Sequence, residues 1–62
     1  MLKLEVSRYN LAGKLLETSY GEPYPNYETL KLWKESEDQL YGPGTPSAEW
    51  NKFYLVHRVV EV

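Results

Sequence analysis

Hydrophobic and polar residues alternate at the start of the chain. Leu2, Leu4 and Val6 are apolar, and the residues between them are polar. This period of two predicts a β-strand with one buried face. Asn10 and Gly13 then predict a turn, because Asn favours the first turn position and Gly takes a positive φ at low cost. A second strand follows, so the chain should begin with a β-hairpin.

The loop at residues 11–13 sets the expected pairing of this hairpin. The predicted partners are Leu4 with Tyr20, Val6 with Thr18, Ser7 with Glu17, and Tyr9 with Leu15. The first two pairs would lie on the inner face of the sheet and the last two on the outer face. A slip by one residue that sets Val6 against Glu17 is disfavoured, since it pairs an apolar core residue with a charge.

A helix is predicted in the middle of the chain. Pro23 and Pro25 end the second strand because proline cannot donate to a β-ladder. Asn26 is a favoured N-cap residue, and Gly42 followed by proline is a helix stop. The apolar residues between them recur at helical spacing, and they are Tyr27, Leu30, Trp33, Leu40 and Tyr41.

The last part of the chain combines an irregular segment with a third strand. Thr45 before Pro46 is a pair that opens a helical turn, and a short turn through Trp50 is predicted. From Phe53 onward, β-branched and aromatic residues predict a strand. Its apolar residues fall on both faces, and they are Leu55, Val56, Val59 and Val60.

These elements predict one α+β domain over residues 1–62, in the order ββαβ. A right-handed crossover through the helix places the third strand beside the first, which gives an antiparallel sheet of order 2-1-3. The helix is expected to pack on one face of this sheet. The other face is then left to water or to a partner.

Composition narrows the classes of function. Seven basic and nine acidic residues give a net charge of −2, which makes nucleic acid an unlikely partner. No apolar run approaches the roughly 20 residues of a membrane-spanning helix, and the first residues do not resemble a secretory signal. The chain also has no cysteine, which suits a reducing compartment. A cytoplasmic protein with no membrane association is therefore expected.

Few residues offer catalytic or ligand-binding chemistry. His57 is the only histidine, and it lies inside a predicted strand rather than on a loop, where catalytic residues are favoured. Of three acidic residues on the predicted helix, Glu35, Glu37 and Asp38, only Glu35 and Asp38 share an edge. The loop that follows has no acidic residue before Glu49, whereas Ca²⁺ takes six or more oxygens. The glycines after this helix lack the lysine of a phosphate loop. We therefore expect no enzyme activity, no cofactor and no metal.

Aromatic residues are the one clear excess, at 15% of the chain. Tyr20, Trp33, Tyr41 and Phe53 are expected to fill the core. Tyrosine and tryptophan are also favoured in protein interfaces, and the predicted partner-binding residues are Tyr9, Leu15, Tyr24, Leu32, Trp50 and Tyr54.

Two alternatives to a protein interface stay open for the aromatic residues. Tyr9 and Tyr54 with Arg8 and Arg58 would form a platform for single-stranded nucleic acid. The remaining aromatics would otherwise simply cap a small core, with their polar tips in water.

The third strand also predicts a dimer. The order 2-1-3 places it at a sheet edge, where natural proteins usually place charge or proline. Here Arg58 and Glu61 are the only charged residues among its apolar side chains. A homodimer through this edge is expected, with Leu55, Val56, Val59 and Val60 at the contact.

Two short segments resemble a known class of proteins. Glu28-Thr29-Leu30 on the helix and Val56-His57-Arg58-Val59 on the closing strand are similar to segments of small phage-encoded inhibitors of host enzymes. The resemblance covers roughly the second half of the chain. It implies a phage or mobile-element inhibitor, or an accessory factor, that occupies a partner surface.

Overall fold

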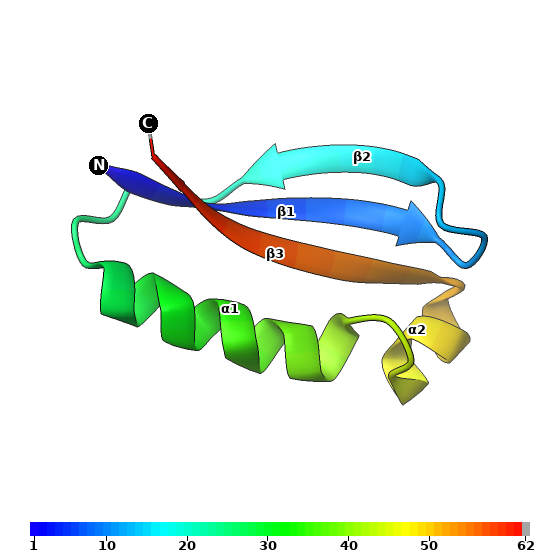
Figure 1. Cartoon of the computed structure of the whole chain (residues 1–62). Coiled ribbons are helices and arrows are strands. Elements are labelled where there is room, and N and C mark those ends of the chain that lie inside the picture. The colour runs from blue at the N-terminus through cyan, green and yellow to red at the C-terminus, as the bar shows by residue number, and fades with distance from the viewer. Residues whose placement is uncertain (62) are drawn as a thin grey trace.

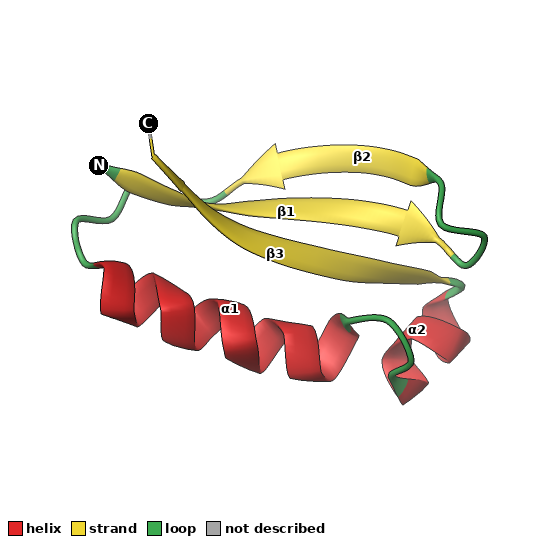
Figure 2. Ribbon diagram, viewed as in Figure 1, coloured by secondary structure: helices red, strands yellow, loops and turns green. Residues whose placement is uncertain are grey.

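The computed structural model describes residues 1–61, which measure 33 × 19 × 13 Å along the principal axes. Figures 1 and 2 show a sheet flanked by one long and one short helix. The elements in chain order are β1 (Leu2–Asn10), β2 (Leu15–Tyr20), α1 (Tyr27–Tyr41), α2 (Pro46–Asn51) and β3 (Phe53–Glu61).

The sheet is antiparallel, with the order β2-β1-β3. β1 therefore lies in the centre and β2 and β3 lie at the edges, as the alternation of residues and the crossover rule predict. β1 pairs with β3 over its whole length, from Leu2 with Glu61 to Asn10 with Phe53. The predicted α+β class and strand order are confirmed.

The hairpin turn has the predicted residues in the predicted roles. The Asn10 side chain accepts hydrogen bonds from the backbone N–H groups of Ala12 and Lys14, at 3.0 and 2.9 Å. The Gly13 N–H donates to the Asn10 carbonyl at 2.9 Å, and Gly13 has φ of 88°. Glycine is favoured here because a side chain is strained at this φ.

The predicted register of the hairpin is wrong beyond its first pair. Tyr9 lies opposite Leu15 as expected, but Arg8 lies opposite Glu17, so Leu16 forms a β-bulge. A bulge adds one residue to one strand and shifts every later pair. Tyr20 therefore lies opposite Glu5, away from the core position that the sequence predicted for it.

Both helices begin at the predicted signals, and α1 also ends at its predicted stop. The Asn26 side chain accepts from the Thr29 N–H at 3.3 Å, and α1 ends at Gly42. A side chain at Gly42 would collide with the Asp38 carbonyl, which explains glycine at this stop. The short helix α2 opens with Thr45, whose hydroxyl accepts from the Ala48 N–H at 3.2 Å.

The predicted packing of α1 over one sheet face is not confirmed. The helix packs mainly against β3, touches β1 and does not contact β2, and Figure 1 shows it beside β3 with β2 on the far side of the sheet. Because it contacts so little of the sheet, α1 buries only a narrow stripe centred on Leu30, which is 1% exposed. The core aromatics predicted on this helix are wrong: Trp33 is 50% exposed, and Tyr41 is also exposed.

Candidate protein interface

The register of β1 with β3 divides the sheet into two faces. Val6 pairs with His57, whose ring contacts Asp38 of α1, so these two side chains mark the inner face. Since neighbouring residues on a strand point to opposite faces, the outer face is carried by the alternate pairs. On β1 and β3 the outer face includes Glu5 with Arg58, Ser7 with Val56, and Tyr9 with Tyr54.

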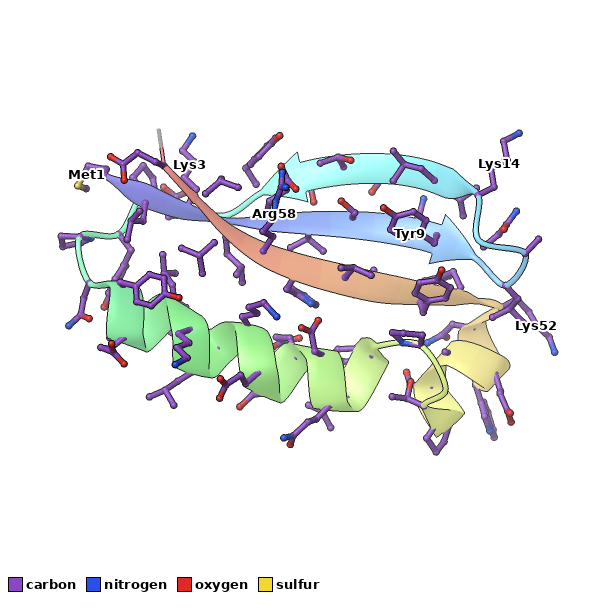
Figure 3. The ribbon with its side chains drawn as sticks, in the orientation of Figure 1. Met1, Lys3, Tyr9, Lys14, Lys52 and Arg58 are labelled. Carbon is purple, nitrogen blue, oxygen red and sulfur yellow. The ribbon has the colours of Figure 1, made fainter. Side chains whose placement is uncertain are left out.

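Side chains on the outer face contact each other across the strands. The rings of Tyr9 and Tyr54 stack with centroids 5.4 Å apart and an angle of 14° between their planes. Arg58 Nη2 lies 3.1 Å from Glu5 Oε1. Tyr9 and Arg58 can be followed in Figure 3. These contacts hold the outer-face side chains in defined positions, which lowers the entropy that binding would otherwise cost.

Glu5 extends this network to β2. The Tyr20 hydroxyl donates to Glu5 Oε2 at 3.1 Å. This hydrogen bond, together with the negative charge of Glu5, raises the pKa of Tyr20 above its usual value. The Glu5 side chain is only 15% exposed, whereas that of Arg58 is 70% exposed. The buried carboxylate therefore orients two groups that remain accessible.

A shallow depression of about 250 Å³ lies at the centre of the outer face. It is lined by Glu5, Ser7, Tyr9, Val56 and Arg58. Its lining comes entirely from β1 and β3, so no helix covers it. Ser7 is the smallest of these side chains and lies between Glu5 and Tyr9 along β1, which explains why the surface is hollow there. The depression joins apolar walls to a carboxylate and a guanidinium, which suits a side chain with an apolar body and a polar tip.

Next to this face, β2 is open to solvent along its whole length. All six of its residues are exposed, and it contacts no helix. The Gly21 N–H donates to the Leu4 carbonyl at 3.0 Å, so the backbone N–H and C=O groups of Gly21 point toward β1. By the alternation of an antiparallel ladder, the backbone groups of Tyr20 and Thr18 point away from β1. Within residues 1–61, no hydrogen bond is made to these outward groups.

The predicted partner-binding residues fall in three places. Tyr9, Leu15 and Tyr54 lie together at the hairpin end of the outer face. Tyr24 instead bridges to Leu2 and packs its ring at 5.4 Å from Trp33. The other two residues lie on the helices: Leu32 is exposed on α1, and Trp50 is 88% exposed on α2. The structure therefore gathers three of the six at one surface.

The alternative nucleic-acid platform is divided between the two faces. Arg8 lies next to Tyr9 on β1 and so points to the inner face, where its guanidinium lies 5.2 Å from the centre of the Phe53 ring and 3.3 Å from Glu17. Arg58 shares the face of Tyr9 but pairs with Glu5. The cationic character that this alternative needs is therefore reduced.

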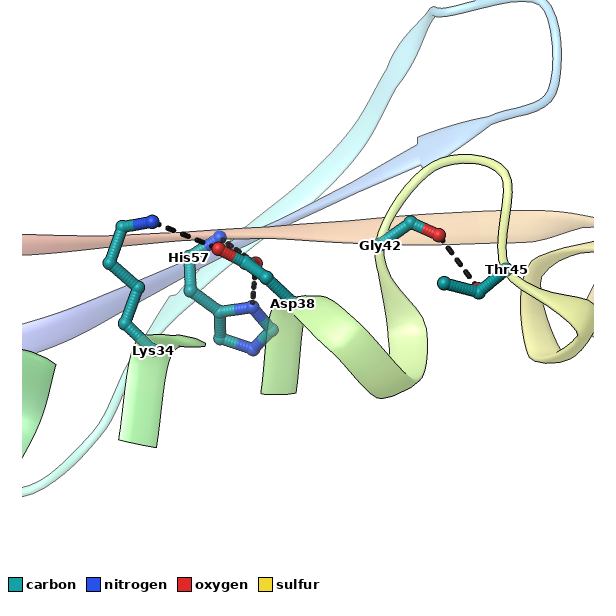
Figure 4. Close-up of polar contacts among 5 residues, drawn as sticks. All are labelled: Lys34, Asp38, Gly42, Thr45 and His57. Atoms are coloured by element: carbon teal, nitrogen blue, oxygen red, sulfur yellow. Dashed lines mark hydrogen bonds and ion pairs between the residues drawn. The ribbon is translucent and has the colours of Figure 1, made fainter. Parts of the chain in front are cut away.

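The predicted dimer edge at β3 is partly occupied by α1. Asp38 Oδ1 accepts from the His57 backbone N–H at 3.2 Å and lies 2.8 Å from His57 Nδ1 (Figure 4). An N–H that bonds to α1 is unavailable to an added strand. Leu55 and Val59 share the inner face of His57, whereas Val56 and Val60 lie on the outer face. The dimer through β3 stays a prediction, and Asp38 argues against it.

The contacts of Asp38 also set its ionisation. Burial opposes the charged form of Asp38, but hydrogen bonds from Lys34 and His57 outweigh it and hold the pKa of Asp38 below its usual value. Lys34 Nζ lies 2.9 Å from Asp38 Oδ2. The fold thus brings a carboxylate to the ring of His57. Asp38 lies 19 positions earlier in the chain, and the sequence alone does not reveal this contact.

Residues 1–61 contain neither a metal-binding cluster nor a membrane-spanning helix. No group of three or more histidine, cysteine or acidic side chains there is placed to hold a metal ion. No helix in the same range is long and apolar enough to cross a membrane. Comparisons with known family models, curated proteins and solved structures found no match to this chain.

Ser7 and Glu5 are the interface residues that sequence reasoning missed. Both were assigned only as polar positions of a strand. The signal that could have found them is the pairing of the first and third strands. Once Leu2 is set against Glu61, a constant antiparallel register brings Glu5 opposite Arg58 and Ser7 opposite Val56.

Proposed function

We propose that the chain is a non-enzymatic protein-binding module, an inhibitor or accessory factor that occupies a surface of its partner. The observation that carries this proposal is the depression of the outer face, which has an aromatic and charged rim and no covering helix. Tyrosine and arginine are enriched where proteins bind each other. Val56 in the same depression is 39% exposed, which supplies apolar area for contact.

The docking surface consists of the depression and the residues beside it. Tyr54 and Leu15 extend it at the hairpin end, and Tyr20 extends it onto β2. The resemblance to small phage inhibitors supports the inhibitor class, and the absence of cysteine from the chain supports action in the cytoplasm. The occupant of the depression would be an anchoring side chain of the partner, with an apolar body and a polar tip.

A pair of arginine substitutions tests this proposal. Ser7→Arg fills the depression, whereas Gln39→Arg adds the same charge to an exposed residue of α1. Each variant and the wild type serve as bait in a lysate of the organism that encodes the chain, and captured proteins are quantified by mass spectrometry. We expect a protein that wild type and Gln39→Arg capture equally and that Ser7→Arg captures at least about tenfold less, a loss of about 1.4 kcal/mol of binding.

Thermal unfolding of each bait separates lost binding from lost structure. If Ser7→Arg does not fold, Val56→Arg replaces it, because Val56 also lines the depression and is more exposed than Ser7. Equal capture by a folded outer-face variant and the wild type would contradict the proposal. Capture of no specific protein by the wild type would contradict it as well.

A further inference from the structure

We infer that α1 packs antiparallel against α1 of a second copy of this chain, through a seam of four residues along the helix. The α1 seam consists of Thr29, Trp33, Ser36 and Leu40. Trp33 and Leu40 are 50% and 58% exposed. Ser36 is also exposed, and Thr29 is half-buried. This pairing does not depend on the outer-face depression, which β1 and β3 line without α1.

The spacing of the seam is that of a helix-packing stripe. Its four positions are separated by four, three and four residues, which keeps them on one side of a helix with 3.6 residues per turn. The a and d positions of a coiled coil have the same spacing. Because α1 runs without interruption from Tyr27 to Tyr41, the seam is continuous along the helix.

The single chain leaves its large apolar side chains on α1 poorly covered. Among residues 1–61, Leu30 and Ala48 are the buried hydrophobic residues. Small domains bury little surface alone, and association is one way in which they gain stability. The ring of Tyr24 lies 5.4 Å from that of Trp33. This contact holds the indole in place, which lowers the entropy that pairing would cost.

The sizes of the seam residues select one register for two antiparallel helices. With the two-fold axis between Lys34 and Glu35, Trp33 of each copy faces Ser36 of the other, and Leu40 faces Thr29. Each large side chain then meets a small one, so the helices can approach closely. With the axis at Trp33, two indoles would meet. With the axis between Ser36 and Glu37, Trp33 would meet Leu40.

The charges of α1 favour the antiparallel direction. Residues 27–34 carry two lysines and one glutamate, and residues 35–41 carry three acidic residues and no basic residue. An antiparallel pair sets the basic half of each helix beside the acidic half of the other. Lys34 pairs with Asp38 inside α1. Even so, a parallel pair would set Glu35 and Glu37 of both copies side by side. Opposed helix dipoles favour the same direction.

The size of the contact sets the expected strength of the dimer. The 15 residues of α1 span about 22 Å, and one helix pair is smaller than a standard interface of roughly 800 Å² per partner. We therefore expect a dimer that dissociates on dilution. Asp38 of α1 contacts the inner-face residue His57, and α1 runs along one side of the molecule (Figure 1). Pairing through α1 therefore leaves both outer-face depressions open.

Sedimentation analysis with a size variant tests the register. The dimer fraction of the wild type, whose chain mass is 7.3 kDa, is measured by analytical ultracentrifugation from about 1 µM to about 1 mM. Ser36→Leu should weaken the dimer at least about tenfold, because the added side chain takes the space that Trp33 of the other copy needs. Gln39→Leu adds the same side chain to α1 outside the seam and should associate as the wild type does.

Leu40→Glu tests the seam itself. It places a charge at the contact with Thr29 of the other copy, so this variant should be monomeric up to the highest concentration. Circular dichroism establishes that it folds, and Leu40→Lys replaces it if it does not. A dimeric wild type beside a folded, monomeric Leu40 variant supports the inference. A wild type that is monomeric throughout, a dimer unaffected by a folded Leu40 variant, or a Ser36→Leu dimer as tight as the wild type would overturn it.

Discussion

Leu30→Ala should unfold much of the protein at room temperature. Leu30 is the large side chain that is fully buried, at 1% exposed, and among residues 1–61 Ala48 is the other buried hydrophobic residue. Truncating a buried leucine costs about 2–5 kcal/mol. A chain of this length has a free energy of unfolding of roughly 3–9 kcal/mol. In urea titrations followed by circular dichroism, the variant should lose most or all of its cooperative transition.

Leu32→Ala is the matched control for this prediction. It makes the same chemical change two residues away on α1, at a side chain that is exposed. Its effect should stay within about 0.5 kcal/mol, as for most surface substitutions. Equal effects of the two substitutions would show that α1 packs against the sheet through a different stripe of residues.

Asp38→Ala should also destabilise the protein strongly. One carboxylate accepts from the backbone N–H of His57, contacts its ring nitrogen and pairs with Lys34. His57 is buried, and leaving a buried donor without an acceptor costs about 1–3 kcal/mol. We expect the free energy of unfolding from urea titration to fall by at least this amount. Asp38→Asn should lose less, because its amide oxygen still accepts from the backbone of His57.

The effect of Asp38 depends on pH. The pKa of Asp38 is lowered in the folded protein. Its ionised form therefore stabilises the fold at pH values above the pKa that Asp38 has in the unfolded chain. That stabilisation is lost as the pH falls through the folded pKa. Urea titrations between about pH 2 and pH 6 should therefore show a difference between wild type and Asp38→Asn that shrinks toward acid. A constant difference over this range would contradict the role of the carboxylate charge.

Local signals in the sequence predict most of the backbone. The alternation of Leu2, Leu4 and Val6, the turn at Gly13 and the Asn26 cap each depend on neighbouring residues, and each is confirmed. The register of β2 failed because a bulge at Leu16 has no signal in sequence. One added residue moved Tyr20 to the outer face.

The burial of α1 could not be predicted from its own pattern. Helical spacing identifies a face, but how much of that face is covered depends on where the helix meets the sheet. Because α1 packs against β3 and not β2, Trp33 remains half exposed. The candidate interface shows the same dependence on long-range contacts. The sequence suggested Tyr9 and Tyr54 as interface residues from composition alone. Their stacking and the nearby depression depend on a register between distant strands.

Nuclear magnetic resonance mapping is the most direct test of the proposed docking surface. The ¹⁵N-labelled chain is titrated with the protein that the wild-type bait captures and the Ser7→Arg bait loses. We predict that the largest chemical-shift changes fall on the outer face, at Ser7, Val56 and Arg58. Changes confined to the exposed side of α1, at Lys31, Leu32 and Gln39, with none at the outer face, would contradict the account.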